Sequence, residues 1–122
     1  MEGQAMVSTR SLEYAVDLKE RFPATWVLYL SIVKKQMIEV LDTVLDGVTP
    51  YWRTVSPDLV QAYHEQEKII LPWTVDNTPT METFTEMGID GIISNRLIDL
   101  MEVLMRKGKI QKLNPSLWKQ LF

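Results

Sequence analysis

The sequence predicts an α/β fold in which parallel strands alternate with helices, and two observations carry this prediction. Short apolar runs rich in strand-forming residues recur along the 122 residues. Segments with helical spacing of apolar residues lie between those runs. A strand returns at intervals of about twenty residues, which is typical of βαβ units with right-handed crossovers. The length is that of one domain with a single core.

Five segments are predicted as strands, because they gather β-branched, aromatic and aliphatic residues into short runs. They are Ala5–Ser8, Trp26–Ile32, Leu45–Val48, Ile69–Val75 and Gly91–Ile93. Side chains that follow such strands meet at one edge of a parallel sheet, where functional groups of α/β proteins gather.

Five helices are predicted from apolar stripes at helical spacing. They cover residues 12–22, 33–44, 57–63, 79–88 and 97–104. Ser56 followed by Pro57 marks the third start, as an N-cap and a first helical position, and Thr78 followed by Pro79 repeats this pattern at the fourth. Gly88 is expected to end the fourth helix in a left-handed conformation, and Gly108 to stop the last one.

Two architectures fit these elements. The first is a partial TIM-type (β/α) barrel of about five parallel strand–helix units. The second is a flavodoxin-like doubly wound sheet that serves as a signalling or binding module, with Asp46 in the manner of a phosphoacceptor. The strands are not the near-continuous Val/Ile runs of a sheet covered on both faces, which favours the barrel.

Charge is unevenly distributed along the chain. Met105–Phe122 carries five basic residues and no acidic one, so residues 1–104 hold all 16 acidic residues. This acidic body would repel a phosphate backbone, so we expect no nucleic-acid partner. The segment 105–122 is predicted to be a basic amphipathic tail that packs Ile110, Leu113, Leu117 and Trp118 on the body. Membrane contact through its basic charge is the alternative.

Composition also limits the chemistry and the location. The chain has no cysteine, which excludes a thiolate nucleophile, a thiolate metal site and a disulfide framework. Its longest apolar run, Trp26–Val33, is much shorter than the roughly 20 residues of a membrane span. No signal-peptide pattern opens the chain. We expect a soluble domain, in the cytoplasm or at a membrane through a further domain.

A specific resemblance rests on "HEQEKIILPWTVDNTPTMETFTEMGIDGIISN", residues 64–95. This stretch resembles the C-terminal signature of the glycerophosphodiester phosphodiesterase family, in which a strand ending Trp-Thr-Val-Asn precedes a helix and Gly-Val-Asp-Gly-Ile-Ile-Thr-Asp. The segments "AMVSTRSLEYAVDLKERFP" and "VSPDLVQAYHEQEKII" are similar to its upstream strand–helix parts. The resemblance covers about residues 5–104 and is greatest to members that carry an extra membrane domain.

The resemblance implies a TIM-type barrel that hydrolyses glycerophosphodiesters to glycerol 3-phosphate and an alcohol. In that family a divalent cation, calcium or magnesium, is held by a Glu-x-Asp pair and a further Glu. Two histidines, one in a His-Arg-Gly motif, act as acid and base. Such a site suits the reaction, because a cation neutralises the diester while proton transfer assists the leaving oxygen.

Those polar motifs are absent from this sequence, which has a single histidine, His64, interpreted as a helix-surface residue. We therefore assign no catalytic residue, no metal ligand and no cofactor to this chain. The resemblance implies two substrate-binding candidates, Trp73 as an apolar wall for the glycerol moiety and Ser11 as a weaker pocket residue. A core position is the alternative for Trp73. Asp76 is predicted to cap the helix that begins near Thr78, or else to face the pocket.

Residues 1–104 are thus interpreted as the C-terminal portion of a phosphodiesterase barrel that is inactive alone. An open barrel exposes strand edges, so we expect the missing N-terminal half, or a second copy of the chain, as partner. A catalytically inactive remnant used for protein or membrane contact is the remaining alternative.

Overall fold

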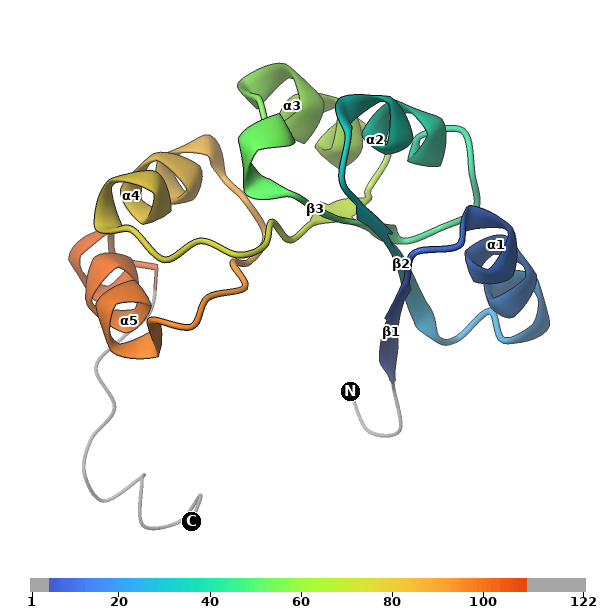
Figure 1. Cartoon of the computed structure of the whole chain (residues 1–122), viewed down its shortest axis with the longest axis horizontal. Helices are drawn as coiled ribbons and strands as arrows, with labels where there is room; N and C mark the ends of the chain where they lie inside the picture. Colours follow the sequence, from blue (N-terminus) through green and yellow to red (C-terminus); the bar gives the residue numbers. More distant parts are fainter. Residues whose placement is uncertain (1–4, 110–122) are drawn as a thin grey trace, which may run out of the picture.

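The computed structural model describes residues 5–109 and contains one sheet of four parallel strands (Figure 1). The strands are β1 (Met6–Thr9), β2 (Trp26–Ser31), β3 (Gly47–Pro50) and β4 (Ile69–Ile70). Their order in the sheet is β1-β2-β3-β4, so each strand pairs with its neighbour along the chain. This order follows from repeated right-handed βαβ crossovers.

Five helices and one 3-10 turn connect and follow the strands. The helices are α1 (Leu12–Arg21), α2 (Lys34–Val40), α3 (Pro57–Glu65), α4 (Thr78–Met87) and α5 (Leu97–Arg106), and the 3-10 turn η1 is Trp52–Thr54. Figure 1 shows α1, α2, α3 and α4 along the outside of an arc whose inner side is formed by the strands. Within residues 5–109, every helix is too short or too polar to cross a bilayer.

Two apolar clusters hold these elements together. The larger one packs strand residues such as Val27, Val48 and Ile70 against Met37 of α2 and Tyr63 of α3. The contribution of β2 to this cluster follows from the alternating directions of side chains along a strand, because every second side chain faces the helices. The smaller cluster joins α4 to α5 through residues that include Val75, Met81, Phe84, Leu100 and Val103. The buried Tyr63 hydroxyl donates to the Met37 carbonyl oxygen at 2.6 Å, and burial raises the pKa of Tyr63 well above its ordinary value.

Two strand predictions need correction. The segment Ile69–Val75 forms a regular strand only over Ile69–Ile70, because Pro72 has no N–H to donate. An isolated parallel bridge between Tyr51 and Trp73 follows it. Gly91–Ile93 forms no regular strand and is tied to the sheet by two bonds, from the Ile93 N–H to the Pro72 carbonyl (3.0 Å) and from the Val75 N–H to the Ile93 carbonyl (2.9 Å). The sheet therefore has four regular strands.

The flavodoxin-like alternative is wrong, because that fold has the first strand inside the sheet whereas here β1 lies at its edge. Asp46 also precedes β3, at the opposite end of the strand from a phosphoacceptor. Two predicted caps are confirmed: the Ser56 hydroxyl accepts the Leu59 N–H at 3.4 Å, and Gly88 has a φ of 82°. The predicted N-cap Thr78 is wrong, because Thr78 is the first residue of α4 and Asn77 caps it.

The boundary after residue 104 stays a prediction. α5 continues through Arg106, across the predicted start of the basic tail. Residues 110–122, the greater part of the predicted tail 105–122, lie outside the described residues. Gly108 has a φ of 71° and follows the end of α5, as its sequence position indicated.

Candidate functional site

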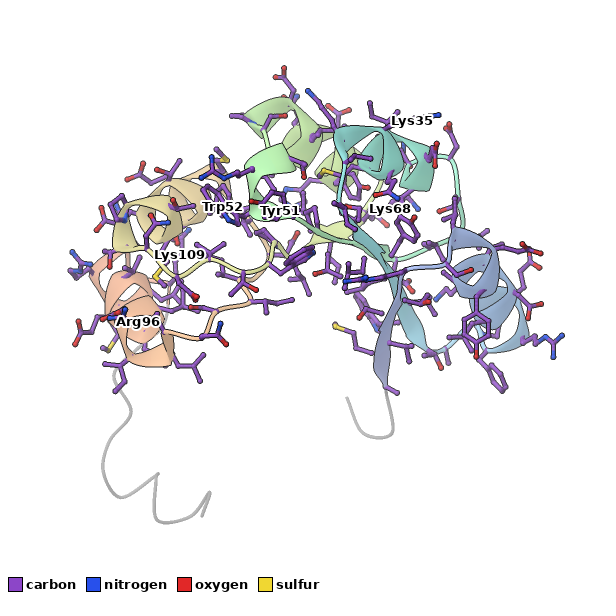
Figure 2. The ribbon with its side chains drawn as sticks, viewed as in Figure 1. Lys35, Tyr51, Trp52, Lys68, Arg96 and Lys109 are labelled. Carbon is purple, nitrogen blue, oxygen red and sulfur yellow. The ribbon has the colours of Figure 1, made fainter. Side chains whose placement is uncertain are left out.

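Aromatic side chains gather where β3 and β4 end, which is the edge where parallel α/β proteins place functional groups. Tyr51 and Trp52 follow β3, and Trp73 follows β4 after a short irregular segment. Figure 2 labels Tyr51 and Trp52 next to each other, where the chain leaves β3. This edge, defined by Tyr51, Trp52 and Trp73, is called the aromatic edge below.

Trp73 is fixed in place by backbone and side-chain bonds. Its indole Nε1–H donates to the Thr49 carbonyl oxygen at 3.0 Å, and its backbone N–H donates to the Pro50 carbonyl at 3.0 Å. The ring packs on Tyr51 with centroids 5.4 Å apart and an interplanar angle of 49°. Trp73 is only half-buried, so part of a rigidly held ring stays accessible to a ligand. Its predicted role as a pocket wall stays a prediction.

Arg53 extends the aromatic edge and was not singled out by the sequence. Its guanidinium carbon lies 4.6 Å from the centroid of the Trp52 ring, in a cation–π arrangement. The ring centroids of Tyr51 and Trp52 lie 6.2 Å apart, with an interplanar angle of 58°. The adjacency of two aromatic residues and an arginine was the available sequence signal, but it did not reveal the stacking.

Asp76 does not cap α4, contrary to the prediction. The cap is Asn77, whose Oδ1 accepts the Thr80 N–H at 2.9 Å, because α4 begins at the very next residue, Thr78. Asp76 lies one position earlier and reaches the segment after Ile93. Its Oδ1 accepts the Asn95 N–H at 2.8 Å and the Ser94 hydroxyl at 3.1 Å.

The Asp76–Asn95 contact ties together the carboxyl ends of the last two strand segments. The Asn95 backbone N–H is the main reason that the pKa of Asp76 lies below its ordinary value, and the side chains of Asn95 and Ser94 add to this effect. The resembling family has Asn and then Asp at these two positions. This chain holds the same two kinds of group in exchanged order, so one carboxylate remains at this edge.

Ser11 lies at the same edge of the sheet, after β1, and is exposed. Its Oγ accepts the Tyr14 N–H at 3.1 Å, which makes Ser11 the N-cap of α1. The cap alone accounts for a serine here. A contact with substrate stays a prediction.

His64 lies away from the aromatic edge. Its Nε2 is 2.9 Å from Asp90 Oδ2, and that same oxygen accepts the N–H of Ile70 in β4. The histidine is exposed on α3, as its interpretation as a surface residue required. Across residues 5–109, no three His, Asp or Glu side chains come together in a way that could hold a metal ion. The described residues therefore do not fit the family's cation site.

Comparison with known proteins supports the sequence resemblance over much of the chain. A glycerophosphodiester phosphodiesterase of Caldanaerobacter subterraneus subsp. tengcongensis is 36% identical over 59 residues, which cover 48% of this chain and 24% of that protein. The chain thus matches about a quarter or less of the curated relatives' length.

Two crystal structures share the fold. One is a Silicibacter pomeroyi protein that carries the glycerophosphoryl diester phosphodiesterase name, with a TM-score of 0.77 and 20% identity over 88% of this chain and 40% of that one. The other is an Oleispira antarctica phosphodiesterase in complex with the product sn-glycerol-3-phosphate, with a TM-score of 0.68 and 14% identity over 82% of this chain and 41% of that one.

The sequence profile of one family matches most of the described elements. It covers residues 7–99, from β1 into the first turn of α5. The likeness to the solved structures gives the same α/β architecture, in which the four strands correspond to part of a TIM-type barrel. The chain belongs to the glycerophosphoryl diester phosphodiesterase family, of which it contains a partial domain.

Proposed function

We propose that this chain forms the C-terminal, pocket-lining part of a glycerophosphodiester phosphodiesterase barrel. The observation that carries the proposal is the fixed, half-buried Trp73 ring at the carboxyl ends of the strands. A rigid aromatic surface suits the carbon atoms of a glycerol moiety, because it offers apolar area without loss of side-chain freedom on binding. The partial match to a phosphodiesterase that binds sn-glycerol-3-phosphate supports this substrate class.

The reaction proposed for the complete enzyme is hydrolysis of a glycerophosphodiester. Water loses a proton to a general base as it attacks phosphorus, the bond to the alcohol oxygen breaks, and that oxygen takes up a proton. If the glycerol 2-hydroxyl attacks first, it loses its proton in the same way and forms a cyclic phosphate, which water then opens to glycerol 3-phosphate. In this chain Trp73 orients the glycerol side, and the Asp76–Asn95 contact keeps the pocket edge in place. The acid–base residues and cation ligands are assigned to other strands of the barrel, so we expect no turnover by this chain alone.

The sheet edges indicate where those strands attach. Within residues 5–109, β1 pairs only with β2, so one of its sides presents unpaired backbone groups, and the segment 91–93 lies at the other edge. Open edges of this kind pair with further strands. We propose that the remaining barrel strands cover both edges, and that a second copy of the chain does so when they are missing. Size-exclusion chromatography of the chain alone should then give a dimer or larger species, and a clean monomer would contradict this proposal.

The binding role of Trp73 is tested by titration with sn-glycerol 3-phosphate, followed by NMR of the indole N–H groups. Trp26 begins β2 at the opposite end of the sheet and is also half-buried, which makes it a matched control. We expect the Trp73 signal to shift and the Trp26 signal to stay. Trp73→Ala should weaken binding by roughly tenfold, the usual cost of losing an aromatic anchor.

Two results would contradict the proposal. One is a shift of Trp26 alone or of neither indole signal. The other is hydrolysis of a glycerophosphodiester by this chain alone with calcium or magnesium, because it would mean that the acid–base and cation groups do not lie elsewhere.

A further inference from the structure

An apolar groove of about 340 Å³ lies between α4, α5 and the loop that joins α4 to the segment 91–93. Its apolar lining comes from Ile89, Ile92, Leu100 and Leu104. A cavity of about 150 Å³ already accepts a benzene-sized group, so this groove has room for more than one aliphatic side chain. Asp90 also lines it and accepts the Ile70 N–H, which places the groove at the amino-terminal end of the sheet, opposite the aromatic edge.

The described chain ends at the rim of this groove, at Lys109 (Figure 2). The last turn of α5 closes with bonds from the Gly108 N–H to the Met105 carbonyl (3.1 Å) and from the Lys109 N–H to the Leu104 carbonyl (2.9 Å). Gly108 is left-handed, with a φ of 71°, which turns the chain out of the helix axis. Lys109, the last described residue, therefore lies beside the groove.

Two ion pairs fix this exit point relative to α4. Lys107 Nζ lies 2.5 Å from Glu86 Oε1, and an Arg106 guanidinium nitrogen lies 3.3 Å from Glu82 Oε1. Each pair is largely exposed and contributes little stability by itself. Together they hold the end of α5 against α4, the two helices that form the groove walls.

The sequence beyond this point has the pattern of a segment that buries one face. Ile110 and Leu113 are three residues apart, and Leu117 and Trp118 continue the same stripe. Covalent attachment gives such a segment a local concentration in the millimolar range at the groove. We propose that Ile110 and Leu113 of the same chain occupy the groove at the amino-terminal end of the sheet.

This docking goes beyond the phosphodiesterase proposal. It concerns the amino-terminal end of the sheet, where residues of such barrels contribute to stability, and it does not involve the aromatic edge at the opposite end. The competing surface for the same segment is the outer face of α5. Leu97 and Ile98 are 64% and 77% exposed there, and Met101 is 45% exposed.

Disulfide trapping distinguishes the two surfaces. Because the chain has no native cysteine, the engineered pair cannot form a disulfide with another thiol of the same chain. The test variant combines Thr85→Cys, in the groove wall, with Leu113→Cys. The control combines Ile98→Cys, on the outer face of α5, with Leu113→Cys. We expect the groove pair to form an intramolecular disulfide under mild oxidation at least tenfold faster than the control, since a disulfide needs Cα atoms within about 7 Å.

A double-mutant cycle of protein stability gives a second measurement, which needs no engineered disulfide. Leu104→Ala and Ile110→Ala should lower the denaturation midpoint by less in combination than the sum of their separate shifts, because contacting residues are coupled. The control pair Met101→Ala and Ile110→Ala should be additive. Additive shifts in the first pair, equal trapping at Ile98→Cys, or a disulfide formed only between chains would overturn the proposal.

Discussion

The two ends of the sheet use polar and aromatic residues in different ways. At the amino-terminal end, charged side chains bind the backbone of neighbouring elements. Asp46 accepts the Val27 N–H at 2.8 Å and pairs with Lys19 at 3.0 Å. Lys68 donates to two carbonyl oxygens, those of Thr43 at 2.8 Å and Leu45 at 2.6 Å. Burial lowers the pKa of Lys68, and the Asp46 charge opposes that shift.

At the carboxyl-terminal end, the larger groups are aromatic and keep part of their surface free. Tyr51 and Trp73 stack on each other, and Arg53 lies over Trp52. The carboxylate of Asp76 at this end is exposed. Charges at the amino-terminal end therefore fix the strands, whereas the aromatic edge, for which we propose a ligand, keeps part of its surface exposed. Complete (β/α) barrels divide stability and function between their two ends in the same way.

Replacing Lys68, a charged residue of the amino-terminal end, should lower the free energy of unfolding more than the other substitutions that compare the two ends. Lys68 is 8% exposed, so Lys68→Met leaves the buried Leu45 carbonyl and the part-buried Thr43 carbonyl without their donor. We expect a loss of about 2–4 kcal/mol in the free energy of unfolding, measured by urea denaturation. Lys35→Met is the matched control, because the Lys35 side chain is 85% exposed and lies 3.9 Å from Glu39 (Figure 2). Equal losses in the two variants would contradict the contrast.

Two aspartates of similar exposure, one at each end of the sheet, allow a direct comparison of the ends. The side chain of Asp90 is 29% exposed and binds both Ile70 and His64, whereas that of Asp99 is 34% exposed and pairs with Arg96. Asp90→Ala should cost about 1–2 kcal/mol, since it removes the acceptor of a strand N–H. Asp99→Ala should cost less than about 1 kcal/mol, as for a surface ion pair. Thermal unfolding of both variants measures the difference, and the reverse order would refute it.

The smallest effect is expected for Asp76→Asn and appears in the pH dependence. The folded-state pKa of Asp76 is lowered, so its stabilising contribution is complete above about pH 4 and is lost as the pH falls through the folded value. The Tm difference between the native chain and Asp76→Asn should therefore be largest near pH 6 and shrink towards pH 2. Asp17→Asn, at an exposed position of α1, controls for the loss of one charge. A Tm difference that does not change with pH would exclude this role.

The presence of each helix could be predicted from the sequence, because it depends on patterns of neighbouring residues. The Ser56–Pro57 start and the Gly88 end of helices are set by residues a few positions apart, and both were found. Strand length was harder to predict. Ile69–Val75 is uniformly apolar, and its shortening depends on where Pro72 meets the neighbouring strand.

The contacts of the candidate site depend on pairs that are distant in sequence. Asp76 and Asn95 are nineteen residues apart, and their contact follows from the parallel placement of two strand ends. The cap prediction for Asp76 was wrong by one residue, because Asn77 has the same capping ability and stands directly before α4. The aromatic edge was partly predictable, since Trp73 was singled out from its position at a strand end.

The strictly sequential strand order has a consequence for how the chain acquires its structure. Each strand pairs with the one that precedes it, so long-range pairing spans only a single strand–helix unit. Proteins with such short sequence separations between contacts fold faster than those that must join distant segments. During synthesis, each unit that leaves the ribosome can dock on the unit completed before it, and the growing sheet always offers one fresh edge to the next strand.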